Sequence, residues 1–161
     1  MTAIFDWNHT VCERDLDDLG HANNISYLKW IQSASLAHSA AQGWPIEAYR
    51  ELGQGWVVRS HSIEYLVSAL LGDRIVVRTW VANLKKVTSL RRYEFIRVSD
   101  AAVLARSASD WAFIDYASGT PKRIPPEVSV AFEIVPDNDD ALRATSAVRH
   151  VVKVSPGTEE H

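Results

Sequence analysis

The stretch from Asp15 to Trp30, Asp-Leu-Asp-Asp-Leu-Gly-His-Ala-Asn-Asn-Ile-Ser-Tyr-Leu-Lys-Trp, decides the fold of this chain. Asn23 and Asn24 are good N-cap residues, and apolar or small residues then recur at intervals of three and four. The recurring positions are Tyr27, Leu28, Ile31, Ala34, Ser35 and His38. The pattern predicts a long helix that begins at the two asparagines and ends near Gly43.

The start of this helix is also where chemistry is expected. N–H groups in a first helical turn have no partner inside the helix and carry about half a positive charge, so they can stabilise an oxygen that becomes negative. Asp17 lies just upstream, in a polar loop. A carboxylate beside such a helix start can attack an acyl group or activate water against one. An aspartate in a loop more often caps a turn, so the loop alone leaves both interpretations open.

β-Branched and aromatic residues dominate most of the remaining chain and indicate strands. We expect strands at residues 4–12, 56–67, 74–83, 88–98 and 103–116, a short helix at 46–52, and another at 125–134 that begins at Pro125-Pro126. Because the last four strands follow one another at short spacing, an antiparallel meander is the simplest pairing. The sequence therefore predicts an α+β domain, with a five-stranded antiparallel sheet wrapped around one long central helix.

The pattern Asp15-x-Asp17-x-x-Gly20-His21-x-Asn23-Asn24-x-x-Tyr27-Leu28 resembles the signature of the 4-hydroxybenzoyl-CoA thioesterase-like branch of the hotdog fold. It has the Gly-His-x-Asn-Asn form that acyl-ACP (acyl carrier protein) thioesterases share. The resemblance covers roughly residues 8–130. It continues through Val57-Val58-Arg59, Ile63-Glu64-Tyr65-Leu66, Leu71-Gly72-Asp73 and Gly119-Thr120-Pro121-Lys122-Arg123-Ile124-Pro125-Pro126-Glu127. The resemblance implies a hotdog domain at residues 1–135. Residues 136–161 lack a sustained apolar period, so we expect a variable C-terminal extension that is partly disordered.

The resemblance assigns catalytic roles to Asp17, His21 and Asn24. It implies that Asp17 is the nucleophile or the general base that acts on a thioester carbonyl, and that the backbone N–H of Asn24 stabilises the oxyanion. His21 would polarise the carbonyl or relay protons, although a structural histidine in a tight loop is nearly as good an interpretation. Glu64 and His61 are held in reserve as strand residues that are more simply explained without catalysis.

Substrate-binding roles follow from the resemblance for six residues: Asn23, Tyr27, Lys86, Thr88, Ser89 and Arg91. Coenzyme A is strongly anionic, so the basic pairs Lys85-Lys86, Arg91-Arg92 and Lys122-Arg123 are candidates to grip its phosphates. Each pair is also typical of a solvated hairpin.

Composition excludes several classes of protein. The chain has 161 residues, a single-domain length, and its net charge of -3 argues against a basic nucleic-acid-binding surface. Its one cysteine, Cys12, excludes an intramolecular disulfide, and we expect it to be a small buried residue of the first strand. The sequence has no span-length apolar run and no signal-peptide pattern, and no Gly-x-Ser-x-Gly, Walker or His-Glu-x-x-His motif.

We therefore expect a cytoplasmic acyl-CoA or acyl-ACP thioester hydrolase that needs no metal and no cofactor. The resemblance implies a homodimer, or a tetramer built from such dimers, that joins the sheets of two subunits and places each site at the interface. A non-catalytic module that binds acyl thioesters or aromatic ligands on the same fold is the alternative. A hotdog dehydratase is disfavoured because its His-x-x-x-x-Pro-Gly pattern is missing.

Overall fold

A computed structural model describes residues 3–137 of the chain. The elements, in order, are β1 (Ile4–Thr10), the 3-10 helix η1 (Glu13–Asp15), α1 (Asn24–Ala41), α2 (Ile46–Leu52), β2 (Gln54–Tyr65), β3 (Arg74–Leu84), β4 (Thr88–Arg97), β5 (Val103–Asp115) and α3 (Pro126–Ser129). Each expected strand and helix is present within a few residues of its expected ends, except that the closing helix is much shorter than expected. The expectation for the C-terminal extension falls on residues 138–161, which lie outside the described part.

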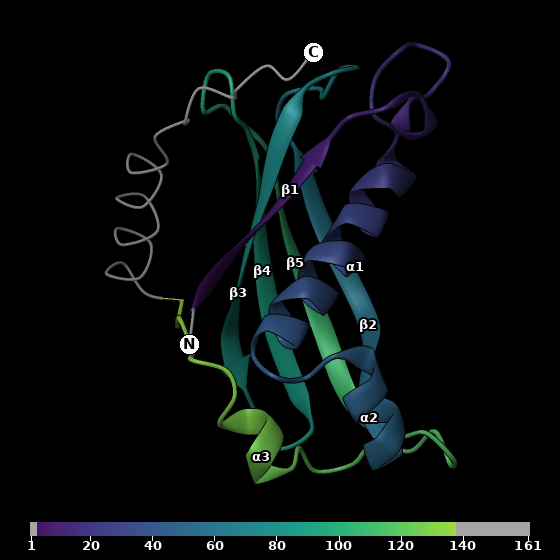
Figure 1. Ribbon diagram of the computed structural model, residues 1–161, viewed down its shortest axis with the longest axis vertical. Helices are drawn as coiled ribbons and strands as arrows, with labels where there is room; N and C mark the ends of the chain where they lie inside the picture. Colours follow the sequence, from purple (N-terminus) through teal and green to yellow (C-terminus); the bar gives the residue numbers. More distant parts are fainter. Residues whose placement is uncertain (1–2, 138–161) are drawn as a thin grey trace.

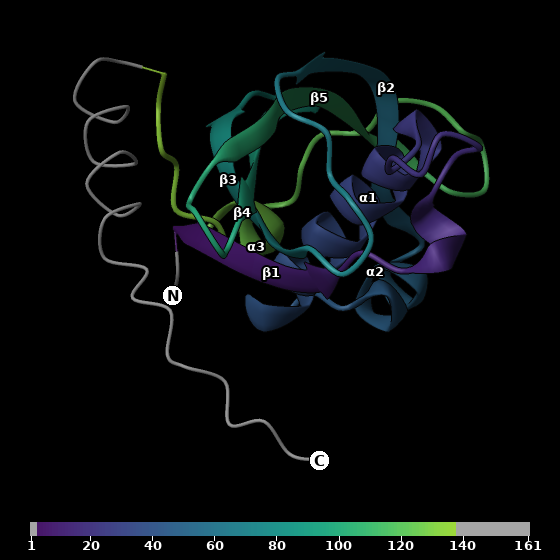
Figure 2. The ribbon, with the colours of Figure 1, turned by 90° about the horizontal axis from the view of Figure 1, so that it is seen from above.

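The sheet has five antiparallel strands in the order β1-β3-β4-β5-β2. It curves around α1, which lies against its concave side (Figures 1 and 2). The expected four-strand meander is wrong, because only β3, β4 and β5 pair in sequence and β2 pairs with β5 at the far edge. Residues 66–73 connect β2 to β3 and form a connection longer than a tight hairpin. This connection carries the chain from β2 at one edge of the sheet to β3 near the opposite edge.

Helix α1 begins and ends where the sequence predicts. The Asn23 side chain accepts a hydrogen bond from the Ser26 N–H at 2.9 Å, so Asn23 is the N-cap. At the other end Gly43 has a φ of 92°, a conformation that favours glycine and directs the chain away from the helix. The predicted inward face needs one correction: Leu28 is 39% exposed, whereas Trp30, which the pattern left out, is 2% exposed.

Two groups of aromatic side chains hold α1 and α2 on the sheet. Near the start of α1, Tyr27 and Trp30 pack against Phe95 of β4, with the Tyr27 and Phe95 ring centroids 5.1 Å apart. Near its end, Tyr49 of α2 packs close to Phe113 of β5. The structure is hollow beside the second group, in a space that Tyr49 helps to line. Within the described residues no helix is long and apolar enough to cross a membrane.

Candidate active site

The loop that leads into α1 is held by Asp15. Its carboxylate accepts hydrogen bonds from the Cys12 N–H at 2.9 Å and the His9 ring at 2.8 Å, and its carbonyl accepts from the Asn23 N–H at 2.8 Å. Burial alone raises the pKa of Asp15, but the hydrogen bonds from Cys12 and His9 together hold that pKa below its ordinary value. Asp15 is therefore a loop hydrogen-bond acceptor, and because it is buried it is not a solvated charge.

Asp17 both caps a turn and leaves one oxygen free. Its Oδ1 accepts hydrogen bonds from the N–H groups of Leu19 at 2.9 Å and His21 at 3.1 Å, and its carbonyl accepts from Gly20, whose φ is 79°. The Asp17 side chain is exposed, and among residues 3–137 nothing binds its Oδ2. The turn-capping interpretation is therefore confirmed for Oδ1, while Oδ2 remains available for chemistry.

His21 and Asn24 lie directly beside this turn. The Asp17 N–H donates to the His21 carbonyl at 2.7 Å, and the His21 ring is exposed and makes no hydrogen bond within the described part of the chain. Asn24 is the first residue of α1, so its backbone N–H belongs to the first turn, where no intrahelical acceptor exists. We call residues 15–24 the helix-start loop. It carries a carboxylate and an imidazole that are linked through the backbone, and it leads directly into the N-terminus of α1.

We expect Asn23→Ala to destabilise the protein by about 1 kcal/mol, because the Ser26 N–H then loses its cap. Asn24→Ala is the matched control: the Asn24 side chain makes no hydrogen bond among residues 3–137, so its loss should change stability much less. Chemical denaturation of the two variants and the wild type measures the difference. Equal losses would contradict the assignment of Asn23 as the cap.

The expected substrate-binding residues do not gather in one place within a single chain. Tyr27 is 2% exposed and belongs to the aromatic core. Lys86, Thr88 and Ser89 lie at the β3–β4 hairpin, at the opposite end of the sheet from the helix-start loop (Figure 1). Lys86 is exposed, whereas Ser89 is buried and donates to the Asn83 carbonyl at 2.8 Å.

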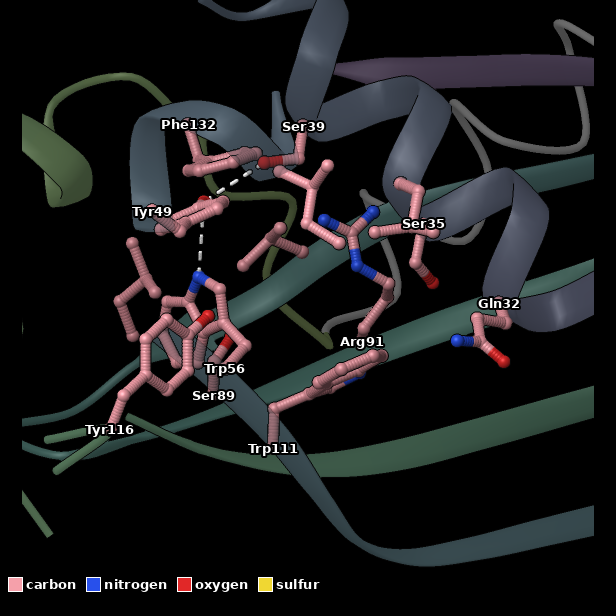
Figure 3. A pocket seen from close by; sticks show the side chains of 14 residues that line it. Gln32, Ser35, Ser39, Tyr49, Trp56, Ser89, Arg91, Trp111, Tyr116 and Phe132 are labelled. Atoms are coloured by element: carbon pink, nitrogen blue, oxygen red, sulfur yellow. Dashed lines mark hydrogen bonds between the residues drawn. The ribbon is translucent and has the colours of Figure 1, made fainter. Parts of the chain in front are cut away.

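Arg91 and its neighbour Arg92 point to opposite faces of the sheet, as alternation along a strand requires. Arg92 pairs on the surface with Asp137. Arg91 is 7% exposed and lines a cavity of about 190 Å³ between α1, α2 and the sheet. We call this space the Arg91 cavity. It is lined by Gln32, Ser35, Leu36, Ser39, Ile46, Tyr49, Trp56, Val81, Leu84, Ser89, Arg91, Trp111, Tyr116 and Phe132 (Figure 3).

A second hollow, of about 440 Å³, lies between the first half of α1 and β2. Its lining residues are Ile25, Leu28, Lys29, Ile31, Gln32, Trp56, Val57, Val58, His61 and Trp111. Three of these, Gln32, Trp56 and Trp111, also line the Arg91 cavity. The two hollows together therefore run along α1 from its first turn, at Ile25, to its last turns. We call the second hollow the α1–β2 trough.

Sequence reasoning missed most of this lining, because it comes from segments that are far apart in the chain. One local signal was available: Arg91, Tyr93 and Phe95 alternate along β4, so two buried aromatic residues predict that Arg91 also faces inward. A second missed group is His9, Cys12 and Asp15, whose potential ligand atoms lie within 4.8 Å of one another. Cys12 is half-buried just after β1 rather than buried within it, and its thiol donates to Asp15 at 3.4 Å.

Comparison with known proteins gives one family. The family model described as "Thioesterase-like superfamily" matches residues 11–132. No curated protein sequence matches the chain significantly.

Solved structures of thioesterases share the fold. A 1,4-dihydroxy-2-naphthoyl-CoA thioesterase from Synechocystis superposes with a TM-score of 0.74 at 19% identity, over 80% of this chain and 94% of that chain. A gentisyl-coenzyme A thioesterase gives 0.70 at 22% identity, over 80% and 98%. A Staphylococcus aureus protein determined in complex with CoA gives 0.75 at 14% identity, over 80% of each chain. These similarities establish the hotdog arrangement of sheet and helix.

Proposed function

The chain belongs to the thioesterase-like superfamily, and on that premise we propose that it hydrolyses acyl-CoA thioesters at the helix-start loop. The observation that supports this site best is the state of the Asp17 carboxylate. Two backbone N–H groups hold Oδ1 in place, Oδ2 has no partner among residues 3–137, and Asp17 lies in the loop that leads into the start of α1. An oriented carboxylate next to an anion-stabilising helix end is what hydrolysis of an acyl group requires.

In the proposed reaction Asp17 Oδ2 acts on the thioester carbon in one of two ways. As a nucleophile it forms an acyl–aspartyl anhydride, the C–S bond breaks to release the thiol, and water then hydrolyses the anhydride. As a general base it takes a proton from water, whose oxygen attacks the carbon directly. Both routes give a carboxylic acid and a free thiol, and in both the Asn24 N–H stabilises the oxyanion while His21 assists proton transfer.

The proposed active unit is a homodimer that pairs through β2. Strand β2 is an edge of the sheet, and its residues Val57 and Val58 are each 37% exposed, which is typical of an edge that another chain covers. A two-fold axis at this edge would pair the β2 strands of the two subunits in antiparallel orientation. The β3–β4 hairpin of the partner subunit would then lie near the helix-start loop of this one. That arrangement supports a role for Lys86 and Thr88 in binding the coenzyme of the neighbouring site.

Purified protein and a thiol-detecting reagent test the proposed function. Acyl-CoAs with short, long, aliphatic and aromatic acyl groups, together with acyl-ACPs, should show release of free thiol from at least one acyl-CoA. Hydrolysis of acyl-ACPs but of no acyl-CoA would show that the thiol portion of the substrate is the carrier protein and not CoA. Binding of acyl-CoAs without thiol release would establish the alternative, a non-catalytic binding module.

A further inference from the structure

The Arg91 cavity holds a buried cation without a matching anion. Arg91 is 7% exposed, and it is the only charged residue among those that line the cavity. Among residues 3–137 it forms no ion pair with any aspartate or glutamate. Burial lowers the pKa of Arg91, yet a guanidinium stays protonated in proteins. A buried charge of this kind is costly unless an opposite charge compensates it.

The neighbours of Arg91 hold one side of the guanidinium and leave the other side open. Nη1 donates to His38 Nδ1 at 2.8 Å and to the Thr79 hydroxyl at 3.2 Å. Because an arginine can only donate, His38 Nδ1 must be the acceptor in this contact, so His38 is neutral and adds no negative charge. Nε and Nη2 have no partner among the described residues, and neither is a buried unsatisfied atom. This two-atom edge therefore faces the open space of the cavity.

The other polar groups that line the cavity offer Arg91 no negative charge. The hydroxyl groups of Ser35 and Ser39 are already bonded, to Tyr93 at 2.7 Å and to Tyr49 at 2.9 Å. The indole N–H of Trp111 is buried without a partner within residues 3–137. Figure 3 shows Arg91 extending from β4 toward α1, with Trp111 beside it. The cavity thus presents a charged two-point donor that no anion of the described residues pairs.

We propose that the Arg91 cavity binds a carboxylate at the far end of the acyl group, so that the substrates are thioesters of dicarboxylic acids. The Nε–Nη2 edge matches the two oxygens of a carboxylate and would bind both. A cavity of about 150 Å³ can hold a benzene ring, so about 190 Å³ takes a terminal carboxylate with several carbons of its chain. The inference rests on the proposed function for the thioester end and on Arg91 for the carboxylate end.

The α1–β2 trough provides the path between the two ends. It begins at Ile25, in the first turn of α1, and shares Gln32 and Trp56 with the Arg91 cavity. The helical rise places Ser35 about 16 Å along α1 from Asn24. A thioester carbonyl at the helix start and a carboxylate at Arg91 would therefore belong to one extended acyl chain. This position also changes the role expected for Arg91, from the coenzyme phosphates to the acyl group.

The test compares Arg91→Met with Arg91→Lys and with Arg106→Met, a matched control whose side chain is half exposed and lies near Glu94 at 3.8 Å. The substrates are CoA monothioesters of dicarboxylic acids of graded length and of the monocarboxylic acids of the same length. We expect wild type to prefer the dicarboxylic series. Arg91→Met should lower kcat/KM for that series about 10- to 100-fold, with little change for the monocarboxylic series. Arg91→Lys should restore part of the loss, and Arg106→Met should behave as wild type.

A binding measurement separates failure of this inference from failure of the proposed function. Isothermal titration of wild type and Arg91→Met with free dicarboxylic acids needs no hydrolysis. Binding of the dicarboxylic acids by wild type but not by Arg91→Met supports the carboxylate site, even if no thiol is ever released. Hydrolysis of both series at equal rates, unchanged in Arg91→Met, would overturn the carboxylate site and leave the thioesterase intact. The methionine variant removes a buried, uncompensated charge, so we expect it to fold. Its thermal unfolding midpoint should lie at most a few degrees below that of wild type.

Discussion

Asp17→Asn should lower kcat for thioester hydrolysis by about 10²- to 10⁴-fold while the fold and substrate binding stay intact. The substitution suits the geometry of the turn. An asparagine keeps an Oδ1 that can accept from the Leu19 and His21 N–H groups, so the capping role survives. What it removes is the negative charge on Oδ2, which the proposed reaction needs. Steady-state kinetics with the best acyl-CoA, together with the thermal unfolding midpoint, measure both effects.

The control for this experiment is Asp18→Asn. Asp18 is the next residue in the same exposed loop and carries the same charge, but no catalytic role is proposed for it. It should retain activity close to that of wild type. If Asp17→Asn also retains activity within a few-fold of wild type, Asp17 is only a turn cap and the proposed mechanism is wrong.

Phe95→Ala should lower the free energy of unfolding by about 3 to 5 kcal/mol. Phe95 is fully buried at the centre of the sheet and packs against Tyr27 and Trp30, with ring centroids at 5.1 and 6.4 Å. Its removal leaves a cavity between the sheet and α1 and also ends the edge-on contact with Tyr27. A loss of this size is a large share of the stability of an ordinary domain, so the variant should unfold at a much lower denaturant concentration.

Val130→Ala provides the comparison. Val130 is 69% exposed, so its truncation should change stability by no more than about 0.5 kcal/mol. Denaturant titration with matched slopes compares the two variants. A loss below about 1.5 kcal/mol in Phe95→Ala would show that α1 is not held to the sheet by this aromatic group.

Local patterns in the sequence predicted the elements well. The capping residue Asn23, the turn at Gly43 and the strand limits depend on neighbouring residues, and each is found where the sequence places it. The strand order could not be predicted in the same way. The pairing of β2 with β5 depends on where residues 66–73 carry the chain, and no local pattern encodes that route.

The same division holds for the candidate site. Asp17, His21 and Asn24 lie within eight positions of one another, so a short sequence motif is enough to group them. The Arg91 cavity is different, because α1, α2, four strands and the segment around Phe132 all contribute to it. The pair Arg91-Arg92 looked like a solvated hairpin because adjacent charges suggest exposure. The alternating aromatic residues Tyr93 and Phe95 were the better guide to the direction of Arg91.

The separation of these two parts has an evolutionary consequence. The groups that would cleave the bond occupy one short continuous loop, whereas the groups that would select the acyl tail come from separate helices and strands. A single replacement of Arg91 would therefore change which acyl groups are accepted and leave the residues of the helix-start loop unchanged. Proteins that descend from one ancestor with this fold would then diverge in substrate specificity while they keep the same catalytic residues.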